Sequence, residues 1–255
     1  MDPKILITHS SPKSPISEAY RVLRTNIQYS GIDKALKTIV VTSSGPREGK
    51  TTTIINLAVT FAQMGSKVLL VDADLRKPRV HRMMEVSNSR GLTNIIALHD
   101  DYQNNLLQCE IENLDIITSG AIPPNPSELL NSNSMKQFVE KVREDYDIVF
   151  IDSPPICSVT DAAILSTIVD GTMLVVASGR VESDALIRAK ELLNKVNANI
   201  IGAVLNMVGK SVQGNYYYYY SYYGDKDENT GGKINPNKHK KTNSGKKQRR
   251  VSLDD

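Results

Sequence analysis

The stretch that decides the fold runs from residue 38 to residue 52 and reads TIVVTSSGPREGKTT. It begins with Thr38–Val41, a compact apolar run that is typical of a strand buried on both faces. A loop of small and polar residues follows and ends in Gly49, Lys50 and Thr51. Apolar residues then recur at helical spacing, at Ile54, Leu57, Ala58 and Phe61. A strand, a glycine-containing loop and a helix in this order predict a phosphate-binding loop (P-loop).

The loop carries groups that suit the phosphates of a nucleotide. Small residues let backbone N–H groups surround a phosphate, and the helix start adds partial positive charge. Lys50 is expected to reach the β- and γ-phosphates, and the Thr51 hydroxyl to bind Mg²⁺. We therefore predict that ATP is bound by Ser44, Gly45, Pro46, Arg47, Glu48, Gly49, Lys50, Thr51 and Thr52. Ser44 departs from the usual pattern, which has glycine there, but Gly45 and Gly49 still supply backbone freedom.

Five further apolar runs predict the remaining strands of the sheet. They are Val68–Val71, Leu114–Ile117, Ile148–Ile151, Met173–Val176 and Ile200–Leu205. Segments with helical periodicity separate them, for example Ala185, Ala189, Leu192 and Val196. The alternation predicts an α/β fold, with a doubly wound, mostly parallel sheet flanked by helices.

Acidic residues follow two of the predicted strands. Asp72 and Asp74 come after the second apolar run, and Asp152 comes after Ile148–Ile151. Ligands of α/β sheets bind at the carboxyl ends of the strands. We predict Lys50, Asp72, Asp74 and Asp152 as the catalytic residues. Thr51, Asp74 and Asp152 are the predicted Mg²⁺ ligands, and one aspartate of the Asp72–Asp74 pair accepts a proton. The alternative is that one of these aspartates caps the following loop.

Two single residues have open roles. Asn206 ends the last predicted strand, where it either contacts the adenine edge or caps a loop. Arg76 follows the Asp72–Asp74 pair, where it balances the acidic cluster, touches a phosphate or forms a surface ion pair.

The chain is expected to fold as one domain between two less ordered ends. Residues 1–13 read as a flexible arm. Ser14 and Pro15 then predict the start of a helix that runs to about Tyr29. We place the folded domain at 14–210, a tyrosine cluster at 211–224 and a disordered basic tail at 225–255.

Tyrosine is concentrated near the end of the chain. Of eleven tyrosines, seven lie within eight positions, namely Tyr216, Tyr217, Tyr218, Tyr219, Tyr220, Tyr222 and Tyr223. The segment from Gly224 to Asp255 holds nine of the 31 Lys and Arg residues and five of the 28 Asp and Glu residues. The preceding 223 residues thus carry 22 basic and 23 acidic residues, so the body is near neutral and no nucleic-acid partner is predicted. No apolar run reaches the roughly 18 residues of a membrane-spanning helix.

These features together resemble the bacterial tyrosine kinases (BY-kinases) of capsule and exopolysaccharide synthesis over residues 14–224. The resemblance rests on the P-loop, the Asp72–Asp74–Arg76 motif, Asp152 and the tyrosine cluster. It implies autophosphorylation of those tyrosines between subunits of a ring-shaped homo-oligomer, with ATP and Mg²⁺. It also implies a separate membrane activator, a cognate tyrosine phosphatase, exopolysaccharide enzymes as substrates, and a cytoplasmic location at the inner face of the membrane.

The first predicted helix matches the same resemblance. Glu18, Arg21 and Arg24 stand three residues apart and form one stripe. The family uses such a stripe for subunit contacts; the alternative is a solvated row of ion pairs within the helix.

Two other functions are compatible with a P-loop. A partitioning or division-type ATPase switch is one, but such proteins carry a signature lysine where this chain has Gly45. The other is a regulator that binds ATP without turnover. Covalent label on tyrosine distinguishes the kinase from both.

Overall fold

The structure is a computed structural model and describes residues 6–30 and 35–209 of the 255-residue chain. The tyrosine cluster and the basic tail predicted from the sequence lie outside these residues.

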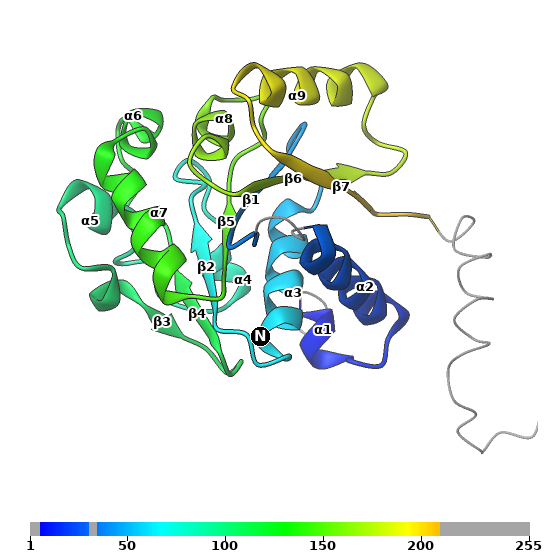
Figure 1. Ribbon diagram of the computed structural model, residues 1–255, viewed down its shortest axis with the longest axis horizontal. Coiled ribbons are helices and arrows are strands. Elements are labelled where there is room, and N and C mark those ends of the chain that lie inside the picture. The colour runs from blue at the N-terminus through cyan, green and yellow to red at the C-terminus, as the bar shows by residue number, and fades with distance from the viewer. Residues whose placement is uncertain (1–5, 31–34, 210–255) are drawn as a thin grey trace, which may run out of the picture.

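A seven-stranded sheet in the order β3-β4-β2-β5-β1-β6-β7 forms the centre of the described chain (Figure 1). Six strands are parallel: β1 (Thr38–Ser43), β2 (Val68–Asp72), β4 (Leu114–Ile117), β5 (Ile148–Asp152), β6 (Gly171–Ala177) and β7 (Ile200–Asn206). Each contains one of the predicted runs, so the doubly wound, mostly parallel sheet is confirmed. No apolar run predicts β3 (Leu107–Gln108), which is antiparallel to β4 and only two residues long.

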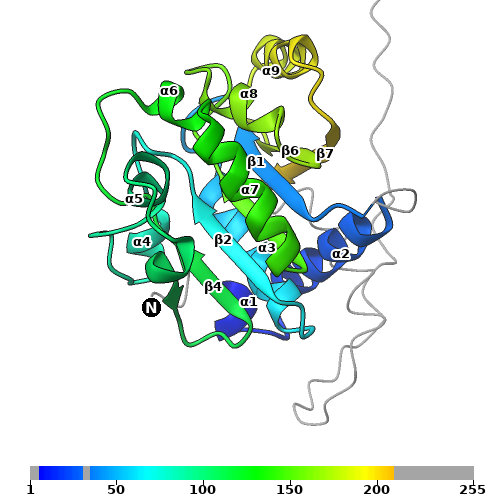
Figure 2. The ribbon, with the colours of Figure 1, turned by 60° about the vertical axis from the view of Figure 1, so that its left-hand side comes forward.

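Helices cover both faces of the sheet (Figure 2). One face carries α1 (Ile7–Ser10), α2 (Pro15–Ser30), α3 (Lys50–Ala62) and α4 (Val80–Met83). The other carries α5 (Leu92–Ala97), α6 (Pro126–Leu130), α7 (Asn133–Asp145), α8 (Asp161–Ser166) and α9 (Ser183–Lys195). A short 3₁₀ helix, η1 (Tyr102–Asn105), precedes β3.

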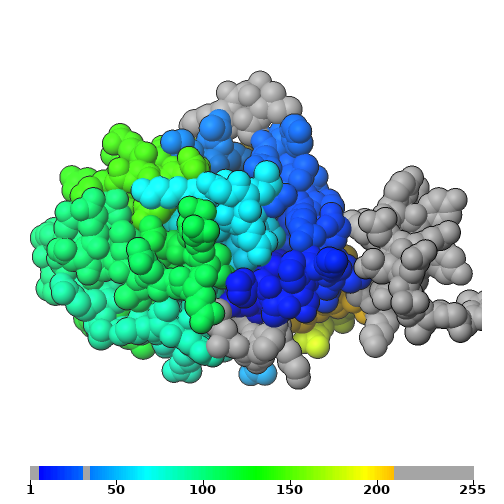
Figure 3. Space-filling view, turned by 90° about the horizontal axis from the view of Figure 1, so that it is seen from below, coloured from blue at the N-terminus to red at the C-terminus, as the bar shows by residue number. Residues whose placement is uncertain are grey.

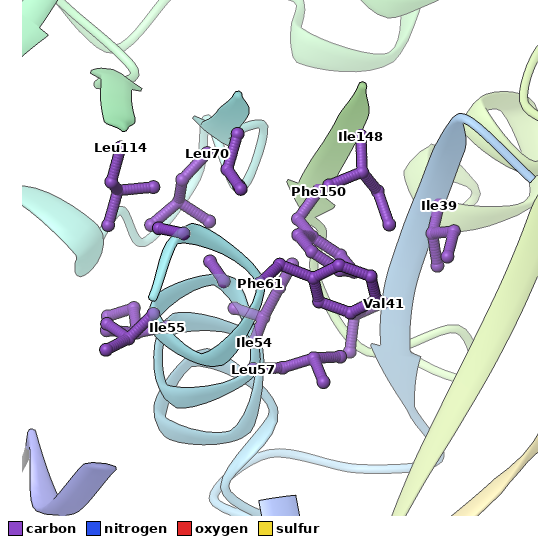
Figure 4. Packing of buried hydrophobic residues seen from close by; sticks show 14 of the residues in the cluster. Ile39, Val41, Ile54, Ile55, Leu57, Phe61, Leu70, Leu114, Ile148 and Phe150 are labelled. Carbon is purple, nitrogen blue, oxygen red and sulfur yellow. The ribbon is translucent and has the colours of Figure 1, made fainter. Parts of the chain in front are cut away.

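Successive residues of the central strands face opposite layers. Ile39 and Val41 of β1 pack toward α3, whereas Val40 packs toward α7. On the α3 side, the rings of Phe61 and Phe150 meet edge to face with centroids 5.4 Å apart (Figure 4). All residues of α3 except Thr52 are buried. The helix that follows the P-loop is therefore fixed within the core, which holds the loop in place.

The predicted flexible arm over residues 1–13 needs correction for its described part. Leu6 is buried, and α1 lies on the outer side of α3. The Thr8 backbone N–H and hydroxyl both donate to Asn56 Oδ1, at 3.1 and 2.9 Å, and Gln63 Nε2 donates to the Thr8 carbonyl at 3.1 Å. These bonds explain why the segment is ordered, because α3 has polar groups on its outer side that need partners. The N-terminal helices, in blue, lie along one side of the molecule in Figure 3.

Candidate nucleotide site

The carboxyl ends of β1, β2 and β5 converge on the P-loop. Asp72 of β2 and Asp152 of β5 are register partners, and Val41 of β1 is the other neighbour of Asp152. The loop leaves β1 at Ser43 and enters α3 at Lys50. The parallel sheet therefore brings the separate sequence motifs to one edge, as predicted.

Lys50 lies among the predicted catalytic carboxylates. Its Nζ is 3.3 Å from Asp74 Oδ2 and 3.5 Å from Asp152 Oδ1. Burial by itself lowers the pKa of Lys50, but the charges of Asp152, Asp74 and Asp72 outweigh it and raise that pKa. Lys50 therefore stays protonated, as phosphate binding requires.

The Thr51 hydroxyl donates to Asp152 Oδ2 at 2.7 Å. Thr51, Asp152 and Asp74 thus present oxygen atoms of the type that Mg²⁺ prefers. Within 6–30 and 35–209, no group of three His, Cys, Asp or Glu side chains is arranged to hold a metal ion. Mg²⁺ in nucleotide sites is commonly held by one or two carboxylates together with the nucleotide phosphates.

Asp72 is fully buried and accepts three backbone N–H groups. Asp74 donates to Oδ1 at 3.2 Å, and Arg79 and Val80 both donate to Oδ2 at 3.0 Å. Burial raises the pKa of Asp72 to about 7, with a further contribution from Asp152, while the N–H donors oppose the change. Asp74 likewise accepts the Lys77 N–H at 3.0 Å. Both aspartates therefore also hold the following loop, as the alternative reading proposed.

The Glu48 side chain braces the loop through hydrogen bonds within the loop and to β6. Its side chain is buried; Oε1 accepts the Ser44 hydroxyl at 2.6 Å and the Gly45 N–H. Oε2 accepts the Ala177 N–H at 3.2 Å and so ties the loop to the end of β6. The prediction that Glu48 lies in the phosphate cradle does not include this brace, because spacing alone does not show which way a loop side chain turns.

Asn206 ties the end of β7 to the same loop. Its Nδ2 donates to the Glu48 carbonyl at 2.9 Å. Gly49 has a φ of +88°, and a Cβ there would lie 2.1 Å from Asn206 Nδ2, so only glycine fits. The structure thus gives Asn206 a loop-holding role, and the adenine contact stays a prediction.

The remaining predicted nucleotide-binding residues, and Arg76, lie outside the hydrogen bonds made by Glu48 and Asn206. Pro46 and Arg47 are exposed at the outer turn, and Arg47 has a positive φ of 64°. Thr52 is partly exposed in the first turn of α3. Arg76 forms a two-bond ion pair with Asp161 of α8, at 2.8 and 3.0 Å. Of its three suggested roles, the ion pair is the one observed, and its acid partner is fully buried.

The residues of the predicted interface stripe on α2 have partners within this chain. Glu18 and Arg21 form an ion pair at 2.7 Å, and Arg21 also donates to the Pro12 carbonyl. Arg24 Nη1 donates to the Thr60 carbonyl of α3 at 2.8 Å. Each arginine is therefore already engaged within this chain.

The brace leads to a first prediction, for Glu48→Gln. Glutamine has only one acceptor oxygen, and its NH₂ group would face an N–H or O–H donor, so at least one buried donor loses its partner. A lost hydrogen bond of this kind costs about 1–3 kcal/mol, which corresponds to roughly 5- to 150-fold weaker nucleotide binding if the loop takes the whole loss. Titration calorimetry with ADP measures this.

Glu182→Gln is the matched control for that prediction, because Glu182 is exposed and lies before α9. Equal ADP affinities for Glu48→Gln and the parent chain would show that the brace does not shape the loop.

Comparisons of the sequence with known proteins agree with the geometry of the site. Residues 16–201 match the AAA domain family. The chain is 44% identical over 222 residues to tyrosine-protein kinase YwqD of Bacillus subtilis (strain 168), which covers 87% of this chain and 92% of that protein. No helix in the described ranges has the length and apolar character needed to cross a bilayer.

Solved structures agree. The kinase domain of Escherichia coli tyrosine kinase ETK has a TM-score of 0.77 at 31% identity and covers 90% of this chain and 84% of that one. The chimerical protein CapA2B2 has a TM-score of 0.77 at 41% identity, with 80% and 90% covered. With Lys50, Asp74 and Asp152 converging behind a braced P-loop, the chain belongs to the bacterial tyrosine-protein kinases and is an enzyme of that class.

Proposed function

We propose that this kinase uses ATP and Mg²⁺ to phosphorylate the tyrosine cluster Tyr216–Tyr223 of another copy of itself. The observation that carries the proposal is the contact of Lys50 with Asp74 and Asp152 at the end of the P-loop. A second support is that seven tyrosines in eight positions belong to the same chain.

The residues divide the work of the transfer. Lys50 and the backbone N–H groups of the loop offset the negative charge that develops on the transferred phosphoryl group. Thr51, Asp152 and Asp74 would hold Mg²⁺, which when bound would add positive charge that offsets the charge of the phosphates. Asp72 accepts the proton of the tyrosine hydroxyl, because a pKa of about 7 suits a general base near neutral pH. Its three N–H donors leave a lone pair for that proton.

We propose that the copies assemble as a ring, with α2 at the contact. Val22 and Tyr29 support this, since these apolar side chains are 43% and 70% exposed and, seven residues apart, lie on one face of the helix. Neighbouring exposed apolar side chains on one helix face suit a surface that a partner covers. Glu18, Arg21 and Arg24 would then exchange their present partners for groups of the neighbouring copy.

The wider setting is proposed from the resemblance of the motifs alone. It comprises a separate membrane activator that holds the kinase at the inner face of the membrane, and a tyrosine phosphatase that reverses the reaction. The output is control of capsule or exopolysaccharide synthesis and export, with enzymes of that synthesis as further substrates.

The experiment is incubation with γ-labelled ATP and Mg²⁺, with and without membranes of the source cell. We expect label on the chain, and its loss to background when all seven cluster tyrosines are changed to Phe. Tyr102→Phe is the matched control, because Tyr102 lies outside the cluster, in η1 on the face of the sheet opposite α2. Release of free phosphate without protein label, even with membranes, would favour an ATPase switch. Neither label nor free phosphate would favour a regulator without turnover.

A further inference from the structure

A group of cations that the reaction described above does not use follows the second acidic motif. Residues 76–82 contain Arg76, Lys77, Arg79 and Arg82 and no acidic residue. Arg76 is engaged by Asp161. Lys77, Arg79 and Arg82 are exposed, and their side chains form no ion pair or hydrogen bond with any residue in 6–30 or 35–209. We call these three residues the basic rim.

The catalytic carboxylates hold the backbone of the basic rim. Asp74 accepts the Lys77 N–H through Oδ1 at 3.0 Å, while its Oδ2 lies 3.3 Å from Lys50 Nζ. Asp72 accepts the Arg79 N–H at 3.0 Å. The Asp74 carboxylate therefore contacts both the backbone of the basic rim and Lys50, which we expect to bind the transferred phosphate. These partly buried hydrogen bonds fix the backbone of Lys77 and Arg79 relative to the catalytic carboxylates.

The charge of the acceptor segment changes during the reaction. Residues 214–223 contain no charged side chain before transfer. Each phosphotyrosine then adds about −1.5 to −2 charges and three strong acceptor oxygens. Exposed Lys and Arg side chains without partners are the groups that recognise such a phosphate. A cationic site at this place therefore binds the product form of the segment better than its unreacted form.

We propose that the basic rim is a binding site for phosphotyrosine, so that the first phosphate on a cluster retains the segment while further tyrosines react. The inference rests on the proposed function. Each cycle breaks the bond from the γ-phosphorus to the bridging oxygen and forms a new bond to the phenolic oxygen. ADP leaves, and the phenolic proton passes to Asp72. The rim itself takes no part in the transfer.

The spacing of the tyrosines suits this arrangement. An extended chain rises about 3.3 Å per residue, so a phosphotyrosine two to four positions away lies roughly 7–13 Å from the reacting one. With seven acceptors in eight positions, every choice of reacting tyrosine leaves a neighbour at that separation. Multiply phosphorylated chains are then expected to form early, while singly phosphorylated chains stay scarce.

Intact mass spectrometry of the full chain during autophosphorylation tests the inference. At a given average number of phosphates per chain, we expect the fraction of singly phosphorylated chains to stay well below the value calculated for seven acceptors that react independently. Lys77→Gln, Arg79→Gln and Arg82→Gln together should restore that fraction. The matched control carries Arg188→Gln, Lys190→Gln and Lys195→Gln, three exposed cations of α9, and should behave as the parent chain.

The outcomes separate this inference from the proposed function. If no phosphate appears on the cluster of the parent chain, the proposed function fails. If phosphate appears with the distribution of independent sites, or if the rim variant keeps the parent distribution, the basic rim is not a phosphotyrosine site. A rim variant that needs more ATP but keeps the parent distribution would assign the rim to the nucleotide instead.

A binding measurement gives a second readout. A synthetic peptide with the sequence of residues 213–224 and one phosphotyrosine should bind the parent chain more tightly than the unphosphorylated peptide. The rim variant should bind the phosphopeptide roughly tenfold or more weakly than the parent chain, as expected for lost charge-assisted hydrogen bonds. Equal binding of both peptides by the parent chain would overturn the inference.

Discussion

Lys50→Met is expected to lower phosphoryl transfer to tyrosine by roughly 10³-fold or more, as for loss of a major electrostatic group at a reacting centre. Lys50 Nζ lies between Asp74 and Asp152 and is the cation that faces them within the described part of the chain. Methionine keeps the length of the side chain but removes the charge that offsets the transferred phosphoryl group. Incorporation of γ-labelled phosphate per minute measures the effect.

The control for this variant is Lys190→Met, because Lys190 is an exposed lysine of α9. Thermal unfolding of Lys50→Met checks that the fold survives the loss of the cation among three carboxylates. A folded Lys50→Met chain with a rate close to the parent would show that the P-loop does not support the transfer.

Asp72→Asn is expected to lower the rate by roughly 10²- to 10⁴-fold, the range for loss of a general base. Asparagine keeps one oxygen for the backbone N–H donors, but it cannot take up the proton. In the parent chain, the rate should rise with pH through about 7, because burial raises the pKa of Asp72 to about 7 and only the ionised form accepts a proton. The residual rate of Asp72→Asn should lose this step.

Stability should depend on pH with the opposite sign. The pKa of Asp72 lies above its ordinary value of 3.8, so the folded chain binds a proton more tightly than the unfolded chain. This contribution to stability is present at acidic pH and is lost as the pH rises through about 7. Thermal unfolding without nucleotide at several pH values should show a weaker dependence for Asp72→Asn than for the parent.

Asp184→Asn, at an exposed position of α9, is the matched control for these measurements. An Asp72→Asn chain that keeps the same pH midpoint in its residual rate would assign the titration to another group. Asp152 is that candidate, because burial also raises its pKa.

The sheet and the meeting of the catalytic residues could be predicted from the sequence. Runs such as Ile148–Ile151 are apolar on both faces, which is specific for central parallel strands. Once those strands are parallel and adjacent, Asp72 and Asp152 must lie at the same edge. The positions of the apolar runs and of the aspartates that follow them were therefore enough to predict that these residues meet.

Side-chain direction in loops and contacts of short elements could not be predicted. Glu48 turns inward because Ser44, Gly45 and Ala177 offer it donors, and two of these three lie within the loop while the third comes from β6. Likewise, the buried Asp161 that pairs with Arg76 lies 85 residues away in the sequence. Such partners become neighbours only through the tertiary fold.

The α2 stripe shows the same limit. Spacing correctly predicts that Glu18 and Arg21 are neighbours on the helix, and they form an ion pair. Spacing does not reveal that the Arg24 side chain extends to α3 and donates to the Thr60 carbonyl. Periodicity defines a face of a helix, while the packing partner decides how each side chain on that face is used.

The proposed function depends on phosphoryl transfer from one copy of the chain to the tyrosine cluster of another. We would mix two variants, neither of which is expected to label its own cluster. Lys50→Met keeps its tyrosines but lacks the P-loop lysine, and the variant with all seven cluster tyrosines changed to Phe keeps an active P-loop. With γ-labelled ATP, Mg²⁺ and source-cell membranes, we expect label on Tyr216–Tyr223 of the Lys50→Met chain. If the parent chain labels itself but the Lys50→Met chain in the mixture stays unlabelled, transfer occurs within one chain and the claim is wrong.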